Sequence, residues 1–335
     1  MLTPPLLLFL GDVPDQLAAK TAQGLVDWRR DWCVGQLRLP GCGADTGLPD
    51  MDVSAAAAKG ARTMVIGVVN PGGKVPEHWQ ATILAALEAG LDVAAGMHTT
   101  LNALPRLAEA ARRLGRKLID VRQPNREFDV GTGRKRTGRR LLTVGTDCSI
   151  GKKYTALAIE KEMRRRGMDA DFRATGQTGI FIAGRGVAID AVVADFISGA
   201  AEWISPDAEP DHWDVIEGQG AILHPSFAGV TLGLLHGSQP DAIVVCHEPT
   251  RKTMRNVVHP IPTIATVIDH TLALGRIVNP EIRAVGIAVN TAALAADAAK
   301  RCLSETADAY GLPACDPSRT GVGPIVDRLI SELGS

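Results

Sequence analysis

Short apolar runs alternate along this chain with longer stretches in which apolar residues recur at helical spacing. The clearest apolar run of the first third, Thr63–Val69 (TMVIGVV), is rich in β-branched residues and predicts a strand. A glycine-rich break follows, and Pro76 then begins a predicted helix that ends at Ala89, with proline in the first turn. Strands that alternate with helices in this way predict a parallel sheet that helices cover on both faces.

The same alternation runs through most of the chain. The predicted strands are residues 5–11, 33–39, 63–69, 91–95, 117–121, 141–145, 170–174, 213–217, 242–246 and 283–289. The predicted helices are residues 15–30, 76–89, 100–114, 151–166, 187–203, 226–236, 263–275 and 292–310. A polar, basic stretch with almost no apolar periodicity, residues 123–140, is interpreted as a linker. We therefore predict two α/β domains, residues 1–122 and 141–335.

The composition excludes several classes of function. Apolar residues make up 45% of the chain and charged residues 22%, which is typical of a soluble globular protein with a large core. The net charge is −1 and aromatic residues are scarce at 4%, so no nucleic-acid partner is expected. No apolar run approaches the ~20 residues that span a bilayer, and we expect no membrane partner.

The cysteines and the N-terminus indicate a compartment. Six cysteines lack the paired spacing of metal ligands, and several lie in apolar or glycine-rich contexts that suit reduced thiols. The N-terminal run MLTPPLLLFLGD has no positively charged start and no small-residue cleavage site. It is interpreted as a first strand rather than as a signal peptide. We expect a cytoplasmic protein without a bound metal.

Residues 141–156 (LLTVGTDCSIGKKYTA) combine a strand, a glycine loop and the start of a helix. Backbone N–H groups of such a loop point inward at one anion, and the helix adds its positive N-terminal end. Lys152 supplies a further positive charge, as in the pattern G-x-x-x-x-G-K-[ST]. This loop has one extra residue, and Lys153 stands where that pattern has the hydroxyl ligand of magnesium. Thr155 follows two residues later. A glycine turn without a ligand is the structural alternative.

Three further stretches accompany the loop: Ala174–Gly176 (ATG), Asp214–Gly220 (DVIEGQG) and Gly286–Asn290 (GIAVN). Together with G-T-D-x-x-x-G-K they resemble dethiobiotin synthetase over residues 141–290. This resemblance implies that the second part is a P-loop domain with a parallel sheet. It also implies that Glu217 helps to hold magnesium and that Asn290 contacts the adenine of a nucleotide.

A second resemblance spans nearly the whole chain. The segments that carry it are GVVNPGGKVPEHW (67–79), GMHTTL (96–101), GTDCSIGKKYTA (145–156), RATGQTGI (173–180), IDAVVADFISGAAE (189–202), EGQGAILHP (217–225) and LLHGSQPDAIVVCHEPTR (234–251). They resemble the D-glutamate N-acetyltransferase family. The resemblance implies an N-terminal Rossmann-like domain followed by a P-loop domain. It also implies transfer of acetyl from acetyl-CoA to the amine of D-glutamate, which gives N-acetyl-D-glutamate and begins a route of D-amino acid catabolism.

Coenzyme A carries a pyrophosphate and a 3′-phosphate, so the loop can hold it without cleavage of ATP. A magnesium ligand is then dispensable, which suits Lys153 as an additional cation beside the phosphates. The alternative is that Lys153 faces solvent on the first helical turn. Cys148 is interpreted as a small loop residue rather than as an acyl carrier. The residues predicted to bind the coenzyme are Gly145, Thr146, Ser149, Gly151, Lys152, Lys153, Tyr154 and Asn290.

Acyl transfer needs a base for the amine, and the candidates are Asp147, Glu217 and His247. Glu217 and His247 follow or end strands, at the edge of an open sheet where ligands bind. The usual pKa of histidine, ~6.5, suits removal of a proton near neutral pH, and a hydrogen-bonded surface histidine is the alternative. Backbone N–H groups of Gly72–Gly73 or Gly218–Gly220 are available for the oxyanion, unless these glycines only make tight turns.

The two carboxylates of glutamate need partners, and arginine binds a carboxylate with two parallel hydrogen bonds. Arg173, Arg185 and Arg251 lie in glycine-rich or strand-end segments, and arginines on a solvated face are the alternative. His98 and Asn70 lie at strand ends of the first domain, and a structural histidine is the alternative for His98. The residues predicted to bind the substrate are Asn70, Gly72, Gly73, His98, Arg173, Gln177 and Arg251.

Two other functions compete with the acetyltransferase. One is an ATP- and magnesium-dependent ligase or carboxylase similar to dethiobiotin synthetase, which Asp147 and Glu217 favour and Lys153 disfavours. The other is a nucleotide-binding regulator without chemistry. Asp190 and Asp195 lie on one predicted helix but do not share a face, so no metal pair is expected there. Relatives of the P-loop domain often work as dimers, and we expect a homodimer.

Overall fold

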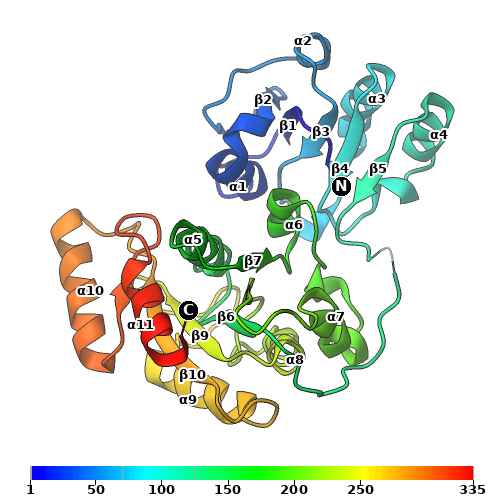
Figure 1. Ribbon diagram of the computed structural model, residues 1–335. Helices are drawn as coiled ribbons and strands as arrows, with labels where there is room; N and C mark the ends of the chain where they lie inside the picture. The colour runs from blue at the N-terminus through cyan, green and yellow to red at the C-terminus, as the bar shows by residue number, and fades with distance from the viewer. Residues whose placement is uncertain (1, 70, 125, 335) are drawn as a thin grey trace. The chain divides into compact units, whose positions relative to one another are not determined.

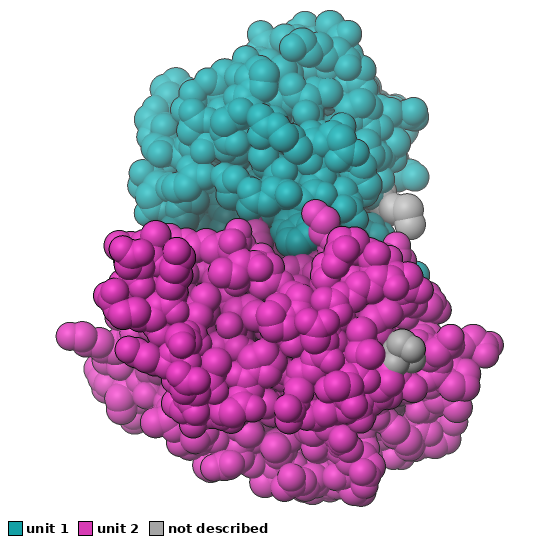
Figure 2. Space-filling view, turned by 60° about the vertical axis from the view of Figure 1, so that its left-hand side comes forward, with its two compact units in different colours: residues 1–125, 176–191 teal, residues 126–175, 192–335 magenta. Residues whose placement is uncertain are grey.

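The computed structural model describes residues 2–69, 71–124 and 126–334 (Figure 1). It divides into two compact units, coloured teal and magenta in Figure 2. Unit 1 comprises residues 1–125 and 176–191, and unit 2 comprises residues 126–175 and 192–335. The sequence analysis places residues 176–191 inside the second domain, whereas the structure packs this segment with unit 1.

Unit 1 has a five-stranded parallel sheet with the strand order β2-β1-β3-β4-β5. Its strands are β1 (Leu6–Gly11), β2 (Cys33–Arg38), β3 (Thr63–Ile66), β4 (Asp92–Ala95) and β5 (Leu118–Asp120). Every residue of β1 and β3 is buried, because a parallel sheet covered on both faces has no solvated side. The predicted Rossmann-like α/β architecture is confirmed.

The helices of unit 1 are α1 (Lys20–Arg29), α2 (Val53–Ala58), α3 (Gln80–Glu88), α4 (Pro105–Leu114) and α6 (Gln177–Ala183). The prediction missed α2 and α6, which are too short to show a helical period. The side chain of Asp52 caps α2 by accepting a hydrogen bond from the N–H of Ala55 at 2.7 Å. Helix α6 packs against α1, where the hydroxyls of Thr21 and Thr178 lie 3.1 Å apart.

Unit 2 has a six-stranded parallel sheet with the strand order β11-β10-β9-β6-β8-β7. Its strands are β6 (Arg139–Gly145), β7 (Ala170–Arg173), β8 (Trp213–Ile216), β9 (Ala242–His247), β10 (Arg283–Val289) and β11 (Ala314–Cys315). From β6 the sheet continues through β8 and β7 on one side and through β9, β10 and β11 on the other. The carboxyl end of β6 is therefore a switch point, the place where open α/β sheets bind ligands.

The helices of unit 2 are α5 (Lys152–Arg165), α7 (Ile197–Ile204), α8 (Ala228–Ser238), α9 (Ile264–Gly275), α10 (Ala296–Tyr310) and α11 (Gly323–Leu333). The predicted helix at 187–203 is wrong: two 3-10 turns, Ile189–Ala191 and Ala194–Phe196, precede α7. The chain passes from unit 1 to unit 2 after residue 191, within the span of the predicted helix. Among the described residues, no helix is long and apolar enough to cross a membrane.

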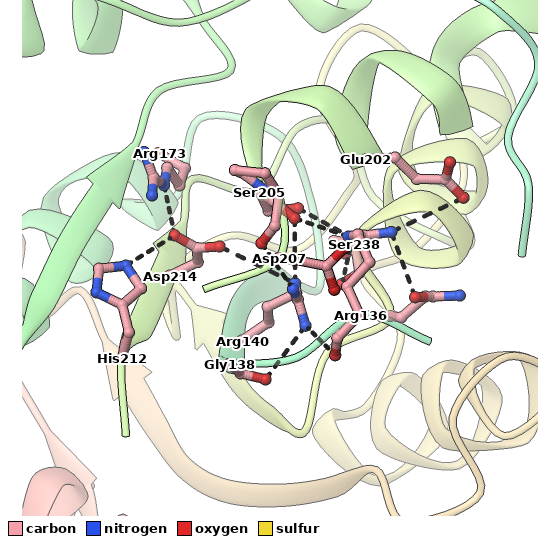
Figure 3. Close-up of polar contacts among 12 residues, drawn as sticks. Arg136, Gly138, Arg140, Arg173, Glu202, Ser205, Asp207, His212, Asp214 and Ser238 are labelled. Carbon is pink, nitrogen blue, oxygen red and sulfur yellow. Dashed lines mark hydrogen bonds and ion pairs between the residues drawn. The ribbon is translucent and has the colours of Figure 1, made fainter. Parts of the chain in front are cut away.

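Charged side chains are buried where β6 begins (Figure 3). Arg140 has 0% exposed side chain, and its guanidinium donates to the carbonyl oxygens of Thr137 and Pro206 at 2.8 and 3.0 Å. Arg136 donates to the carbonyl oxygen of Ser205 at 2.7 Å. Burial lowers the pKa of both guanidinium groups. The C-terminal end of the predicted linker 123–140 is therefore a packed part of unit 2.

Asp214 compensates this positive charge from the neighbouring strand β8 (Figure 3). One of its carboxylate oxygens accepts a hydrogen bond from Arg173 Nε at 2.5 Å, and the other lies 4.0 Å from Arg140 Nε. His212 Nε2 lies 3.3 Å from the same carboxylate. We call Arg136, Arg140, Arg173 and Asp214 the arginine cluster.

Candidate phosphate-binding site

The carboxyl ends of β6, β8 and β9 lie close together in unit 2. A Cβ atom added at Gly145, the last residue of β6, would lie 2.9 Å from the carbonyl oxygen of Cys246 in β9. A Cβ atom at Gly218 would lie 1.6 Å from the carbonyl oxygen of Thr143. The N–H of Gly218 also donates to the Thr143 hydroxyl at 2.9 Å. Glycine at position 145 lets β6 and β9 approach closely at their ends, and glycine at position 218 lets the segment that follows Glu217 lie against β6.

The loop that joins β6 to α5, residues 146–151, has the form of an anion cradle. Ser149 and Gly151 both have left-handed backbone conformations, with φ of 53° and 115°. Lys152 begins α5 and is buried, and its Nζ donates to the carbonyl oxygen of Asp147 at 2.7 Å. Burial lowers the pKa of Lys152. The positive end of the α5 dipole adds to the charge of Lys152, so the loop has the geometry and the positive charge that suit an anion.

Asp147, a predicted base, is fully buried inside the loop. Its Oδ2 atom accepts hydrogen bonds from Arg251 Nη1 at 2.7 Å and from the N–H of Arg255 at 2.8 Å. Its Oδ1 atom has no hydrogen-bond partner among the described residues and lies 3.8 Å from His224 Nε2. This carboxylate ties the loop to the segment that follows β9.

Arg251, predicted to bind a substrate carboxylate, is bonded to the loop instead. Besides Asp147, it donates to the carbonyl oxygen of Cys148 at 2.7 Å and to that of Ser149 at 3.3 Å. Glu248 Oε2 lies 2.7 Å from its other terminal nitrogen. Contact with a substrate carboxylate would require Arg251 to give up some of these bonds. The same holds for Arg173, which is bonded to Asp214 in the arginine cluster.

The other two predicted bases lie at the ends of β9 and β8, the two strands that flank β6. His247 ends β9, and its Nδ1 atom lies 3.0 Å from the hydroxyl of Thr146 in the loop. Burial lowers the pKa of His247, so the imidazole is neutral at neutral pH. Glu217 follows β8 and is buried, and its Oε2 atom accepts a hydrogen bond from the N–H of Thr175 at 3.0 Å. Asn290 follows β10, and its N–H donates to the carbonyl oxygen of His247 at 2.8 Å.

The first turn of α5 bears on the magnesium alternative. The hydroxyl of Thr155 donates to the carbonyl oxygen of Gly151 at 3.1 Å, an internal bond of the helix. The ammonium group of Lys153 lies 4.8 Å from the centre of the Tyr154 ring. The loop therefore presents a cation, rather than a hydroxyl, at the position that follows Lys152.

Asp147, Cys148 and His224 could together hold a metal ion, because their ligand atoms lie within 4.8 Å of one another. In this structure, however, His224 Nδ1 accepts from the N–H of Ser226 at 3.1 Å, and Nε2 lies 3.0 Å from the carbonyl oxygen of Arg255. Burial raises the pKa of Cys148, which favours the thiol over the metal-binding thiolate. The donor set as arranged therefore does not fit a metal. His224 is not among the predicted site residues, although it lies in the motif 217–225.

Several predicted substrate residues lie in unit 1, in the loops that follow β3 and β4. Gly72 and Gly73 have positive φ angles of 76° and 58°, and Gly73 accepts a hydrogen bond from the N–H of Thr99 at 2.9 Å. A Cβ atom at Gly73 would lie 2.4 Å from His98 Cδ2, so the two loops are in contact. Gln177, the first residue of α6, lies against Gly96. Asn70 lies outside the described residues.

Unit 1 also contains polar residues at this sheet edge that the sequence analysis missed. Asp12 follows β1 and accepts hydrogen bonds from Trp79 Nε1 at 2.8 Å, while His78 Nε2 lies 2.9 Å from its other oxygen. The bond from Trp79 is the main cause of a lowered pKa of Asp12. Arg122 follows β5 and pairs with Asp190, which lies in the 3-10 turn Ile189–Ala191, at 2.7 Å. Asp12 and Arg122 have no motif spacing that would have indicated these contacts.

Comparison with known proteins identifies the family. Residues 129–326 match the family described as a domain of unknown function, DUF1611, P-loop domain, and residues 37–124 match its Rossmann-like N-terminal domain. A protein of Tritonibacter scottomollicae named D-glutamate N-acetyltransferase is 51% identical over 330 residues, which cover 98% of this chain and 99% of that protein. The chain belongs to the DUF1611 family. A second D-glutamate N-acetyltransferase, from a Pseudoalteromonas species, is 49% identical over 97% of this chain and 98% of its own length.

The structure agrees with this membership. The crystal structure of a DUF1611 family protein from Anabaena variabilis is 32% identical and superimposes with a TM-score of 0.90, covering 98% of this chain and all of that protein. The predicted order of a Rossmann-like domain and a P-loop domain is confirmed. The predicted enzyme class is confirmed as well: this DUF1611 member is an acyltransferase.

Proposed function

We propose that the chain transfers the acetyl group of acetyl-CoA to the amine of D-glutamate, giving N-acetyl-D-glutamate. One observation carries this proposal: a relative named D-glutamate N-acetyltransferase is 51% identical to this chain over 98% of its length. An identity of this extent covers both units, the phosphate loop and the strand ends around it. We also infer that the protein is cytoplasmic and that it forms a homodimer. Light scattering on the purified protein would test the dimer.

The phosphate loop is the proposed site of the coenzyme. Its backbone N–H groups and the N-terminus of α5 are suited to the pyrophosphate of acetyl-CoA. Lys152 is held beside the loop by its bond to the carbonyl oxygen of Asp147. Lys153 supplies a second positive charge in the same turn, which suits a ligand with three phosphate groups better than it suits a magnesium ion.

His247 is the proposed base. Its lowered pKa keeps the imidazole neutral near pH 7, so it can accept a proton from the substrate ammonium. The amine nitrogen then attacks the carbonyl carbon of the thioester, and the bond between that carbon and sulfur breaks. The second proton of the nitrogen passes to the departing thiolate, which leaves as the thiol of coenzyme A. Gly72, Gly73, His98 and Gln177 stay the residues that the sequence predicts to bind the substrate.

A ligase that uses ATP and magnesium is the second candidate, because two buried carboxylates, Asp147 and Glu217, lie at the phosphate loop. One assay separates the two functions. Purified protein is mixed with acetyl-CoA and D-glutamate, and free thiol is followed with L-glutamate as the control for stereochemistry. We expect thiol release that depends on D-glutamate, with N-acetyl-D-glutamate detected by mass spectrometry. Absence of this release, together with ADP formation from ATP, would refute the proposal.

A further inference from the structure

We propose that Arg251 is a positioning residue that orients the backbone N–H groups of the phosphate loop. In this role it sets the affinity for a phosphate-bearing ligand without contacting that ligand. The inference rests on the proposed function only for the identity of the ligand, acetyl-CoA. It replaces the carboxylate contact that the sequence suggested for Arg251.

Three consecutive carbonyl groups of the loop are bonded to cations. The carbonyl oxygen of Asp147 accepts from Lys152 Nζ at 2.7 Å. The next two, of Cys148 and Ser149, accept from the terminal nitrogens of Arg251 at 2.7 and 3.3 Å. One arginine and one lysine therefore hold all three carbonyl groups.

The direction of these carbonyl groups fixes the direction of the donors that follow them. In a trans peptide the C=O of one residue and the N–H of the next point in opposite directions. The N–H groups of Cys148, Ser149 and Ile150 must consequently point away from the two cations. None of these three groups donates a hydrogen bond within the described part of the chain. They are the kind of aligned, unpaired donors that bind phosphate oxygens.

The backbone of Ser149 supports the same conclusion. Its φ of 53° lies in the left-handed region, which is unfavourable for a residue with a side chain. Such a conformation persists where the surroundings hold it, and these positions gather at ligand-binding loops. The bond from Arg251 to the Ser149 carbonyl oxygen is one such restraint.

Two carboxylates in turn fix the guanidinium of Arg251. Asp147 Oδ2 accepts from Nη1 at 2.7 Å, and Glu248 Oε2 lies 2.7 Å from Nη2. Each terminal nitrogen thus joins one carboxylate to one loop carbonyl. Only the planar fork of arginine spans this pattern, and the single ammonium of a lysine cannot.

The test compares ligand binding by four proteins: the wild type and the variants Arg251→Met, Arg251→Lys and Lys252→Met. Lys252 is the matched control, because it is exposed and its removal takes one positive charge from the same segment. Each protein is titrated calorimetrically with acetyl-CoA and with inorganic pyrophosphate. For Arg251→Met we expect both ligands to bind roughly tenfold to a hundredfold more weakly, the effect of losing hydrogen bonds to a charged group. Arg251→Lys should recover part of the affinity, and Lys252→Met should bind like the wild type.

Steady-state kinetics then separate positioning from general damage. We expect Arg251→Met to raise the KM for acetyl-CoA and to leave kcat and the KM for D-glutamate near the wild-type values. A fall in kcat with an unchanged KM for acetyl-CoA would overturn the inference. If Arg251→Met does not fold, Glu248→Gln removes one restraint on the guanidinium and should raise the same KM by a smaller factor. An unchanged KM in that variant would also count against the role of Arg251.

The two ligands distinguish failure of this inference from failure of the proposed function. If Arg251→Met binds both ligands like the wild type while Lys152→Ala does not, the loop is the phosphate site and Arg251 does not orient it. If the wild type binds pyrophosphate but not acetyl-CoA, and Arg251→Met loses pyrophosphate, the inference holds and the proposed coenzyme is wrong.

Discussion

At both ends of β6 in unit 2, arginine side chains donate hydrogen bonds to main-chain carbonyl oxygens. Where the strand begins, Arg140 of the arginine cluster donates to the carbonyl oxygens of Thr137 and Pro206, and its side chain is 0% exposed. Where the strand ends, Arg251 donates to two carbonyl oxygens of the phosphate loop, and its side chain is 21% exposed. The same chemistry therefore serves two environments that differ in their access to solvent.

The two ends of β6 differ in which polar groups have hydrogen-bond partners within the protein. In the arginine cluster, Asp214 lies between Arg140 and Arg173 and pairs with both. At the phosphate loop, the N–H groups opposite the held carbonyls have no partner within the described part of the chain. The hydrogen bonds of the arginine cluster stabilise the fold. The hydrogen bonds from Arg251 to the phosphate loop hold N–H donors in place for a ligand. The following substitutions test this distinction.

Arg140→Met should have the largest effect on stability. It leaves the carboxylate of Asp214 and several carbonyl groups without this cation in the interior. Asp214 keeps its hydrogen bond from Arg173, and each buried carbonyl oxygen left without a donor costs about 1–3 kcal/mol of unfolding free energy. Denaturant unfolding measures this loss, with Arg134→Met as the control, since the Arg134 side chain is 66% exposed in its pair with Asp207. Equal free energies of unfolding for the two variants would mean that the buried Arg140 contributes no more to stability than the exposed Arg134.

Gly218→Ala should damage the phosphate-loop end of the sheet. The added Cβ atom would lie 1.6 Å from the Thr143 carbonyl oxygen, so β6 and the segment after β8 must move apart. We expect a loss of about 1–3 kcal/mol of unfolding free energy, together with weaker binding of acetyl-CoA. Gly229→Ala in α8 is the matched control, because its Cβ atom would meet nothing within 4 Å. Wild-type binding by Gly218→Ala would mean that this close approach does not shape the site.

Arg251→Met should weaken ligand binding more than it lowers stability, whereas Arg140→Met should mainly lower stability. We expect its unfolding free energy to fall by about 1.5–3 kcal/mol, because the buried Asp147 keeps the N–H of Arg255 as a hydrogen-bond partner, while ligand affinity falls at least tenfold. Thermal unfolding of the unliganded variant, measured beside the titrations, checks both halves. A loss of stability as large as that of Arg140→Met would show that the two arginines contribute equally to the stability of the fold.

His247 should give the smallest effect, a dependence of stability on pH. Because its pKa in the folded chain is lowered, the unfolded chain takes up a proton first as the pH falls below ~6.5. The free energy of unfolding should therefore fall in this range, by at most about 1.4 kcal/mol per pH unit, until the folded form is protonated as well. His247→Gln should flatten that slope, as measured by denaturant unfolding between pH 5 and 7. An identical slope in the variant would mean that other groups cause it.

Much of the fold could be predicted from the sequence because buried parallel strands appear as continuous apolar runs. The predicted strand at 213–217 corresponds to β8, and the predicted strand at 283–289 corresponds to β10. The helix predicted at 187–203 failed for a reason that lies in tertiary structure. Its residues belong to two units, and local periodicity carries no information about where a chain changes unit.

The candidate site was also only partly predictable from the sequence. The phosphate loop could be located from its glycines and Lys152, since that motif is local. The role of Arg251 could not, because it depends on a bond to Asp147, which lies 104 residues earlier in the chain. From the sequence alone, an arginine after a strand is equally suited to a substrate carboxylate. Which carboxylate it meets is decided only by the folding of β6 beside β9.

The central claim is that acetyl-CoA binds to the phosphate loop of unit 2. Calorimetric titration of acetyl-CoA into the wild type and into Lys152→Ala tests it most directly. Lys152 is a buried cation beside the loop, so we expect the dissociation constant to rise at least tenfold in the variant. An unchanged dissociation constant would contradict the account, because the coenzyme would then bind elsewhere.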